Sequence, residues 1–190
     1  MANTLKSIIN VKANDEAIKN LTSKLDELKY NDITNFAQTF YENVEISGGG
    51  VMNSWSLDNL GSKWTYFVDA SSDDEFIIDS AWYPPKEFFI HLYKMMSSID
   101  PETIIEVRYE DESYNPVGAF LIKKDENGDV FYSQNEEEGL ENPTDDMDWD
   151  DENYDQVQMD FMDSVYEKIE EMLRLCYEDI DNGDGYDLND

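Results

Sequence analysis

Carboxylates are the side chains whose type and spacing could do chemistry in this sequence. The 190 residues include 45 acidic and 13 basic ones, which gives a formal net charge of −32. Residues 135–190 hold 22 of the acids against only Lys168 and Arg174, a net charge of −20, whereas residues 1–44 have a net charge of −1. A surface adapted to high salt would be acidic throughout, so this concentration favours a local function.

The same charge restricts the partners. Phosphates of DNA, RNA and anionic membranes would repel the chain, so we expect no direct binding to nucleic acid or to a membrane. Cationic partners are favoured instead, either a basic macromolecule or a divalent metal ion. A basic, nucleic-acid-binding host protein is the partner that fits this charge best.

Residues 155–178 predict a helix that carries a row of carboxylates. At about 1.5 Å per residue it would be about 36 Å long, with about one carboxylate per 5 Å. One DNA strand places a phosphate about every 3.4 Å, so the two linear charge densities are comparable. Trp149 lies among the preceding acids, either as an apolar anchor of the kind found in segments that order on binding or as a side chain that packs back on the chain's own sheet. The expected partner-binding residues are Glu136, Glu137, Glu138, Asp145, Asp146, Asp148, Trp149, Asp150, Asp151, Glu152, Asp155, Asp160, Asp163, Glu167, Glu170 and Glu171.

Residues for other chemistry are scarce. His91 and Cys176 are the only histidine and the only cysteine, which excludes an imidazole or thiolate metal cluster. The glycines at 48–50 are not followed by the Lys-Ser/Thr pair of a phosphate loop, and there is no dinucleotide fingerprint and no nucleophile elbow. The stretch 179–186 resembles a calcium loop, but Ile180 falls on the first ligand position. We therefore expect no catalytic residue, no cofactor and no metal site.

Hydrophobic patterning predicts that residues 1–134 form an α+β domain with a mostly antiparallel sheet and helices on one face. Asn127-Gly128 predicts a type I′ hairpin between the last two strands. Strands are expected at 5–13, 63–70, 75–82, 103–110, 117–123 and 130–133, and helices at 14–30, 32–44 and 84–98.

The acidic third is predicted to comprise a linker at 135–154 and a helix with a tail at 155–190. An apolar stripe along this helix must pack against something, either the chain's own sheet or a second copy in a homodimer. The stripe comprises Phe161, Met162, Val165, Ile169, Met172, Leu173 and Cys176. Cys176 lies on the stripe and is expected to be a small core residue. No leader or membrane span is visible, so a cytoplasmic location is expected, in the host cell if the protein is phage-encoded.

Three motifs lie in the middle of the chain: Asn59-Leu60-Gly61-Ser62-Lys63-Trp64, Ser80-Ala81-Trp82-Tyr83-Pro84-Pro85 and Asn115-Pro116-Val117-Gly118. They resemble the YubB ferredoxin-like family of small plasmid and phage proteins. The resemblance covers about residues 50–134; it implies a ferredoxin-like α+β fold and an origin in a mobile element, and it supplies no catalytic residue. Trp64 and Trp82 are expected to face the core or to close a strand–helix corner.

The leading hypothesis is therefore a DNA-mimic-like inhibitor from a phage or plasmid, which occupies the basic nucleic-acid site of a host protein, for example a defence component. One alternative is a general protein-interaction module with a solubilising acidic tail. The other is a divalent-ion-binding protein.

Overall fold

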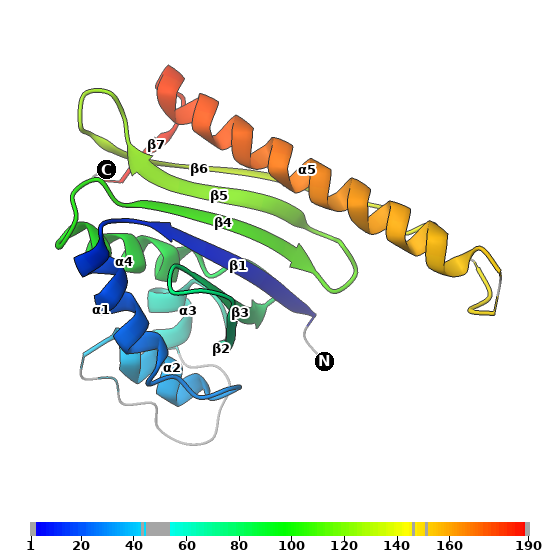
Figure 1. The fold of residues 1–190 in the computed structure, drawn as a ribbon, viewed down its shortest axis with the longest axis horizontal. Helices are drawn as coiled ribbons and strands as arrows, with labels where there is room; N and C mark the ends of the chain where they lie inside the picture. Colours follow the sequence, from blue (N-terminus) through cyan, green and yellow to red (C-terminus); the bar gives the residue numbers. More distant parts are fainter. Residues whose placement is uncertain (1–2, 43, 45–53, 146, 151, 189–190) are drawn as a thin grey trace.

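A computed structural model describes residues 3–42, 44, 54–145, 147–150 and 152–188 (Figure 1). Its centre is a seven-stranded antiparallel sheet with strand order β2-β3-β1-β4-β5-β6-β7. The predicted α+β class is confirmed. The strands are β1 (Thr4–Lys12), β2 (Thr65–Ala70), β3 (Glu75–Ala81), β4 (Ile104–Asp111), β5 (Val117–Lys124), β6 (Val130–Glu137) and β7 (Tyr186–Asp187). The helices are α1 (Asp15–Leu25), α2 (Ile33–Phe40), α3 (Ser54–Leu60), α4 (Lys86–Ser97) and α5 (Tyr154–Asn182).

Side-chain caps begin the first two helices where the sequence predicts them. The carboxamide oxygen of Asn14 accepts a hydrogen bond from the Ala17 amide at 3.0 Å. The carboxylate of Asp32 accepts one from the Asn35 amide at 2.9 Å. Each cap satisfies a backbone N–H that the first helical turn leaves without a partner.

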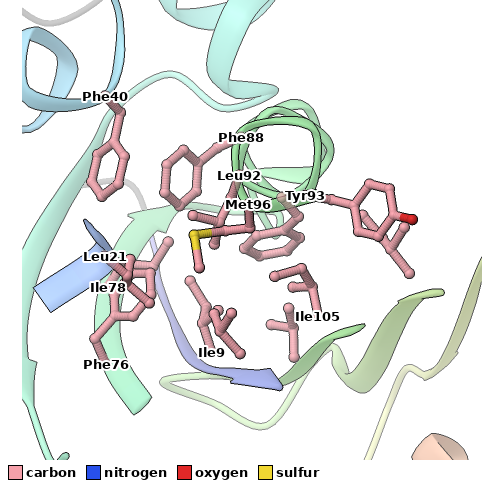
Figure 2. Close-up of a cluster of buried hydrophobic side chains, with 14 of the residues drawn as sticks. Ile9, Leu21, Phe40, Phe76, Ile78, Phe88, Leu92, Tyr93, Met96 and Ile105 are labelled. Atoms are coloured by element: carbon pink, nitrogen blue, oxygen red, sulfur yellow. The ribbon is translucent and has the colours of Figure 1, made fainter. Parts of the chain in front are cut away.

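The larger core lies between one face of the sheet and helices α1, α2 and α4 (Figure 2). Alternate residues of β1, such as Leu5 and Ile9, point into it and are fully buried. Phe36, Phe40 and Phe88 form a ring cluster with centroids 4.9 to 5.2 Å apart. These aromatic rings join α2 to α4 above the sheet.

The opposite face of the sheet is covered by α5, which packs on β5 and β6 and touches β4 (Figure 1). Strand β5 is consequently buried on both sides: Phe120 faces the larger core, and Ala119 and Leu121 face α5. The prediction that the helices lie on one face of the sheet holds for α1, α2 and α4, whereas α5 covers the opposite face. Hydrophobic periodicity shows that a helix has an apolar face but not which sheet face it will cover.

Some local expectations differ from the structure. Strand β6 continues to Glu137, so the acidic stretch does not begin as a linker at 135. Gly128 has φ +89° but Asn127 is not in the left-handed region, so the hairpin turn is not type I′. The Asp125 carboxylate stabilises this turn because it accepts hydrogen bonds from the backbone amides of Asn127 and Asp129, both at 2.9 Å.

The two tryptophans of the resemblance are not core residues. Trp82 is 43% exposed with φ +63°, and Lys63 Nζ lies 4.7 Å from the centre of its ring. Trp64 is half-buried and stacks on Tyr66. The expected glycine loop at 48–50 lies outside the described residues.

Gly118 allows β4, β5 and β6 to approach closely. A Cβ at this position would lie 2.5 Å from the Tyr109 hydroxyl oxygen and 2.6 Å from the Asn135 carbonyl oxygen. We expect Gly118→Ala to lower the free energy of unfolding by about 1–3 kcal/mol, measured by urea denaturation, because the buried neighbours must move. The control is Gly128→Asn. A Cβ added at Gly128 would have no neighbouring atom within 4 Å, and asparagine tolerates positive φ. Equal losses in both variants would contradict the packing argument.

Candidate interaction surface on α5

Helix α5 is attached to its own sheet by the predicted apolar stripe. Val165, Ile169, Leu173 and Cys176 are at most 5% exposed and pack against β5. Burial raises the pKa of the Cys176 thiol, as expected for a core cysteine with little thiolate character. The helix therefore packs in cis, and this stripe is not available to a second copy.

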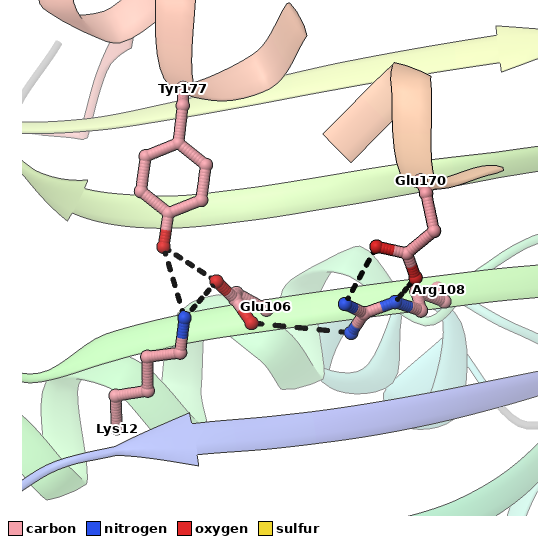
Figure 3. Close-up of polar contacts among 5 residues, drawn as sticks. All are labelled: Lys12, Glu106, Arg108, Glu170 and Tyr177. Carbon is pink, nitrogen blue, oxygen red and sulfur yellow. Dashed lines mark hydrogen bonds and ion pairs between the residues drawn. The ribbon is translucent and has the colours of Figure 1, made fainter. Parts of the chain in front are cut away.

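A polar network adds to this attachment (Figure 3). Glu106 of β4 has a side chain only 5% exposed, and it pairs with Lys12 of β1. It also accepts a hydrogen bond from the Tyr177 hydroxyl of α5 at 2.6 Å. Burial, together with this bond to a carboxylate, raises the pKa of Tyr177 well above its ordinary value. The buried charge is thus held by a cation and a hydroxyl from two other elements.

Arg108 makes the second link between the sheet and α5. It donates two hydrogen bonds to the Glu170 carboxylate, one of them from Nη2 at 3.2 Å. The hydrogen bond from Arg108 is the main reason that the pKa of Glu170 is held below its ordinary value. Glu170 was expected to bind a partner. It instead forms an ion pair with Arg108 of the same chain.

Most acidic side chains in the C-terminal half of α5 are also paired with other side chains of the same chain. Arg174 pairs with Glu171 and with Glu178, three residues before it and four after it on the helix. Lys123 of β5 pairs with Asp181. Asp179 accepts hydrogen bonds from Ser133 at 2.7 Å and from Asn135. These carboxylates are already partly compensated.

The N-terminal half of α5 and the loop before it differ. Asp155, Asp160, Asp163 and Glu167 are exposed, and none takes part in an ion pair among residues that the structure describes. The loop acids that can be placed are also exposed: Asp145, Asp148, Asp150 and Glu152. This end of α5, yellow to orange in Figure 1, extends beyond the turn between β4 and β5.

The remaining predicted residues do not form one continuous row with these. Glu136 and Glu137 are neighbours on β6 and therefore lie on opposite faces of the sheet. Glu136 accepts a hydrogen bond from the Tyr109 hydroxyl at 3.0 Å, and Glu137 pairs with Lys168 of α5 at 2.9 Å. Glu138 is exposed. Asp146 and Asp151 lie outside the described residues.

Exposed apolar side chains accompany the free carboxylates. Trp149 is 85% exposed, as a partner anchor would be. Met159 and Tyr166 are each about 60% exposed, and Met162, expected in the packing stripe, is 51% exposed. Met159 and Tyr166 are not among the residues that the sequence predicts for partner binding. Their offset from the buried stripe is the signal that could have identified them.

Within the described ranges, no group of three or more His, Cys, Asp or Glu side chains could hold a metal ion. His91 lies with Nε2 2.9 Å from the Phe40 carbonyl oxygen at the end of α2, and its ring stacks on Tyr41. His91 of α4 thus contacts the C-terminal end of α2. None of the helices that the structure describes is long and apolar enough to cross a membrane.

Comparison of the chain with protein-family models, with curated proteins and with solved structures finds no match. The resemblance to the YubB family therefore rests on the three sequence motifs alone.

The Arg108–Glu170 link predicts a pH dependence of stability. A carboxyl group whose pKa is lower in the folded state stabilises the fold above its unfolded pKa, and this contribution is lost as the pH falls through the folded value. We expect Glu170→Gln to lower the free energy of unfolding by about 1 kcal/mol near neutral pH, a figure reduced for the 37% exposure of the Glu170 side chain. The difference should shrink below about pH 4.

Urea denaturation at several pH values measures this effect. Glu167→Gln is the matched control, because Glu167 is exposed and pairs with no cation in the described part of the chain. A Glu170→Gln effect that stays constant from neutral to acid pH would argue against the ion pair as its cause.

Proposed function

We propose that this chain is a DNA-mimic-like inhibitor, encoded by a phage or plasmid, that occupies the basic nucleic-acid site of a host protein. The observation that carries the proposal is the division of α5. Acids of its C-terminal half are compensated by Arg174, Lys123 and Arg108, whereas Asp155, Asp160, Asp163 and Glu167 are exposed and form no ion pair among the described residues. The negative surface open to a partner is thus the N-terminal half of α5 with the loop before it.

Uncompensated carboxylates on one rigid helix favour a cationic partner. Adjacent like charges on a helix cost a few tenths of a kcal/mol per pair, and a basic groove would remove this repulsion. Residues 154–167 extend about 21 Å, the length of about six phosphates on one DNA strand. Long-range attraction would make association fast and sensitive to salt.

We further propose that β1 to β4, with the helices that connect them, form a ferredoxin-like unit. Support comes from the strand order β2-β3-β1-β4 with antiparallel neighbours, and from helices in the β1–β2 and β3–β4 connections. In this view β5 and β6 extend the unit and provide the surface on which the acidic helix α5 packs.

A general protein-interaction module is the second candidate, favoured by the exposed Trp149 and Met159. Removing residues 135–190 would not distinguish the two functions. It would expose to water the apolar side chains of β5 that α5 covers, and so would disturb the fold itself. Neutralising charges on the intact fold is the cleaner comparison.

The charge test compares two variants that each remove four negative charges. Asp155→Asn, Asp160→Asn, Asp163→Asn and Glu167→Gln together neutralise the free carboxylates. Glu137→Gln, Glu171→Gln, Glu178→Gln and Asp181→Asn neutralise the compensated ones and form the control. We expect the first set to weaken binding at least about tenfold and to reduce its salt dependence, and the control to change affinity less than about threefold.

Basic proteins captured from a bacterial lysate and eluted in a salt gradient provide the partners for this measurement. Each captured protein is then assayed for DNA binding with increasing amounts of this chain. Competitive loss of DNA binding is the expected outcome. Affinity that ignores salt and DNA competitor, or equal effects of the two variant sets, would refute mimicry.

Trp149 should act separately from the charges. Because its side chain is 85% exposed, we expect Trp149→Ala to leave the free energy of unfolding unchanged within about 0.5 kcal/mol. If Trp149 anchors the partner, the same change should weaken binding at least about tenfold without altering the salt dependence. Leu57→Ala, which changes an exposed apolar residue far from α5 in sequence, is the matched control. Unchanged partner affinity for Trp149→Ala would remove Trp149 from the interface.

A further inference from the structure

A small apolar cavity lies under the N-terminal half of α5. Its volume is about 210 Å³. Its floor is formed by two cross-strand pairs, Lys6 with Glu110 and Ile8 with Arg108, on the sheet face that α5 only partly covers. It opens to solvent between these strands and the helix.

The wall of the cavity is one face of α5. Met162, Tyr166 and Ile169 contribute to it, at the i, i+4 and i+7 spacing that places side chains on the same side of a helix. Tyr114 of the β4–β5 turn closes one end and packs edge-on against Phe161, with ring centres 5.0 Å apart. Met162 and Tyr166 are more than half exposed, so a guest can reach the cavity without a rearrangement of the core.

The charges at the cavity are internally balanced. Lys6 lies 3.6 Å from Glu110, and Arg108 binds Glu170. An anionic ligand would have to displace these carboxylates, and an isolated cation would find both of them occupied. The cavity itself therefore suits an uncharged apolar group.

Size narrows the guest further. A dry cavity of about 150 Å³ can hold one benzene ring, whereas pockets for drug-sized ligands are about 300–1,000 Å³. A cavity of 210 Å³ therefore fits one aromatic or branched aliphatic side chain and is too small for a nucleotide.

The charged residues around the cavity indicate what kind of molecule would carry this side chain. Asp163 and Glu167 directly follow the lining residues Met162 and Tyr166, and both are exposed carboxylates. A guest attached to a basic polypeptide would meet opposite charge next to an apolar cavity, the arrangement of a buried anchor inside a polar rim.

We propose that this cavity is an anchor site, which receives one large apolar side chain from a basic segment of the partner protein. The inference rests on the proposed function, because it assumes a cationic partner on α5. It adds that binding depends on shape as well as on charge. Such an anchor would let the chain distinguish one basic site from the many others in a cell, which charge alone does poorly.

Indole tests the cavity without any partner. In a titration of the ¹⁵N-labelled chain followed by NMR, we expect saturable shifts of the amides of Ile8, Arg108, Met162 and Tyr166. Ile8→Phe, which fills the floor, and Tyr166→Ala, which removes a wall from an exposed position, should each weaken indole binding at least about tenfold. Absence of saturable binding, or binding that ignores both variants, would overturn the inference.

Lysine-rich peptides separate the anchor from the charge. Two short labelled peptides, one with a central tryptophan and one with a central alanine between lysines, are titrated by fluorescence anisotropy. We expect the tryptophan peptide to bind the unmodified chain at least about tenfold more tightly. In Ile8→Phe this ratio should fall below about threefold while the alanine peptide keeps its affinity.

The peptides also distinguish the two proposals. In the variant that neutralises Asp155, Asp160, Asp163 and Glu167, both peptides should weaken and the ratio should remain. Equal binding of the two peptides to the unmodified chain would overturn the anchor site and leave the charge proposal intact. Failure of the lysine peptides to bind at low salt would instead count against the charge proposal, and indole would still decide the cavity.

Discussion

The burial of one helix stripe on the back of the sheet is the contact on which the rest of this molecule depends. Strand β5 is apolar on both faces, and without α5 its Ala119 and Leu121 would be exposed to water. Burial of Val165, Ile169 and Leu173 offsets the cost of ordering an acidic helix. The acidic helix is therefore part of the fold and has a fixed position on the sheet.

That position determines which carboxylates remain free. The cations beneath and along α5 are Arg108, Lys123, Lys168 and Arg174, and most of the acids that they pair with belong to the helix. Pairing is concentrated toward the C-terminal half, where the helix lies over the sheet. At the other end, Lys6 of the sheet is paired with Glu110, and Asp155, Asp160, Asp163 and Glu167 form no ion pair among the described residues, so their charge remains directed to solvent.

The two proposals describe one surface at two levels. Free carboxylates attract a basic partner over a distance of about a Debye length but discriminate little between one cationic groove and another. The cavity between α5 and β1 is neutral and too small for anything larger than one side chain. Charge would thus determine the association rate, and the fit of a single apolar side chain would determine the dissociation rate.

The sequence by itself determined the element types and much of their placement. Alternation in β1, the caps Asn14 and Asp32, and the apolar spacing of α5 are local signals, so they could be read without the fold. The acidity of the last third can be read directly from the sequence, but the sequence left open whether Trp149 is exposed or packs on the chain's own sheet. Helix α3 and the short strand β7, which pairs with the edge strand β6, were not predicted.

Only the tertiary structure decided which acids are available. Glu170 and Glu167 are both helix glutamates on an acidic chain, and they differ because Arg108 of β4 lies within reach of one and not the other. That difference depends on strands that are distant in sequence and on the sheet face that α5 covers. Periodicity specifies the apolar side of a helix, but pairing between side chains depends on positions in space.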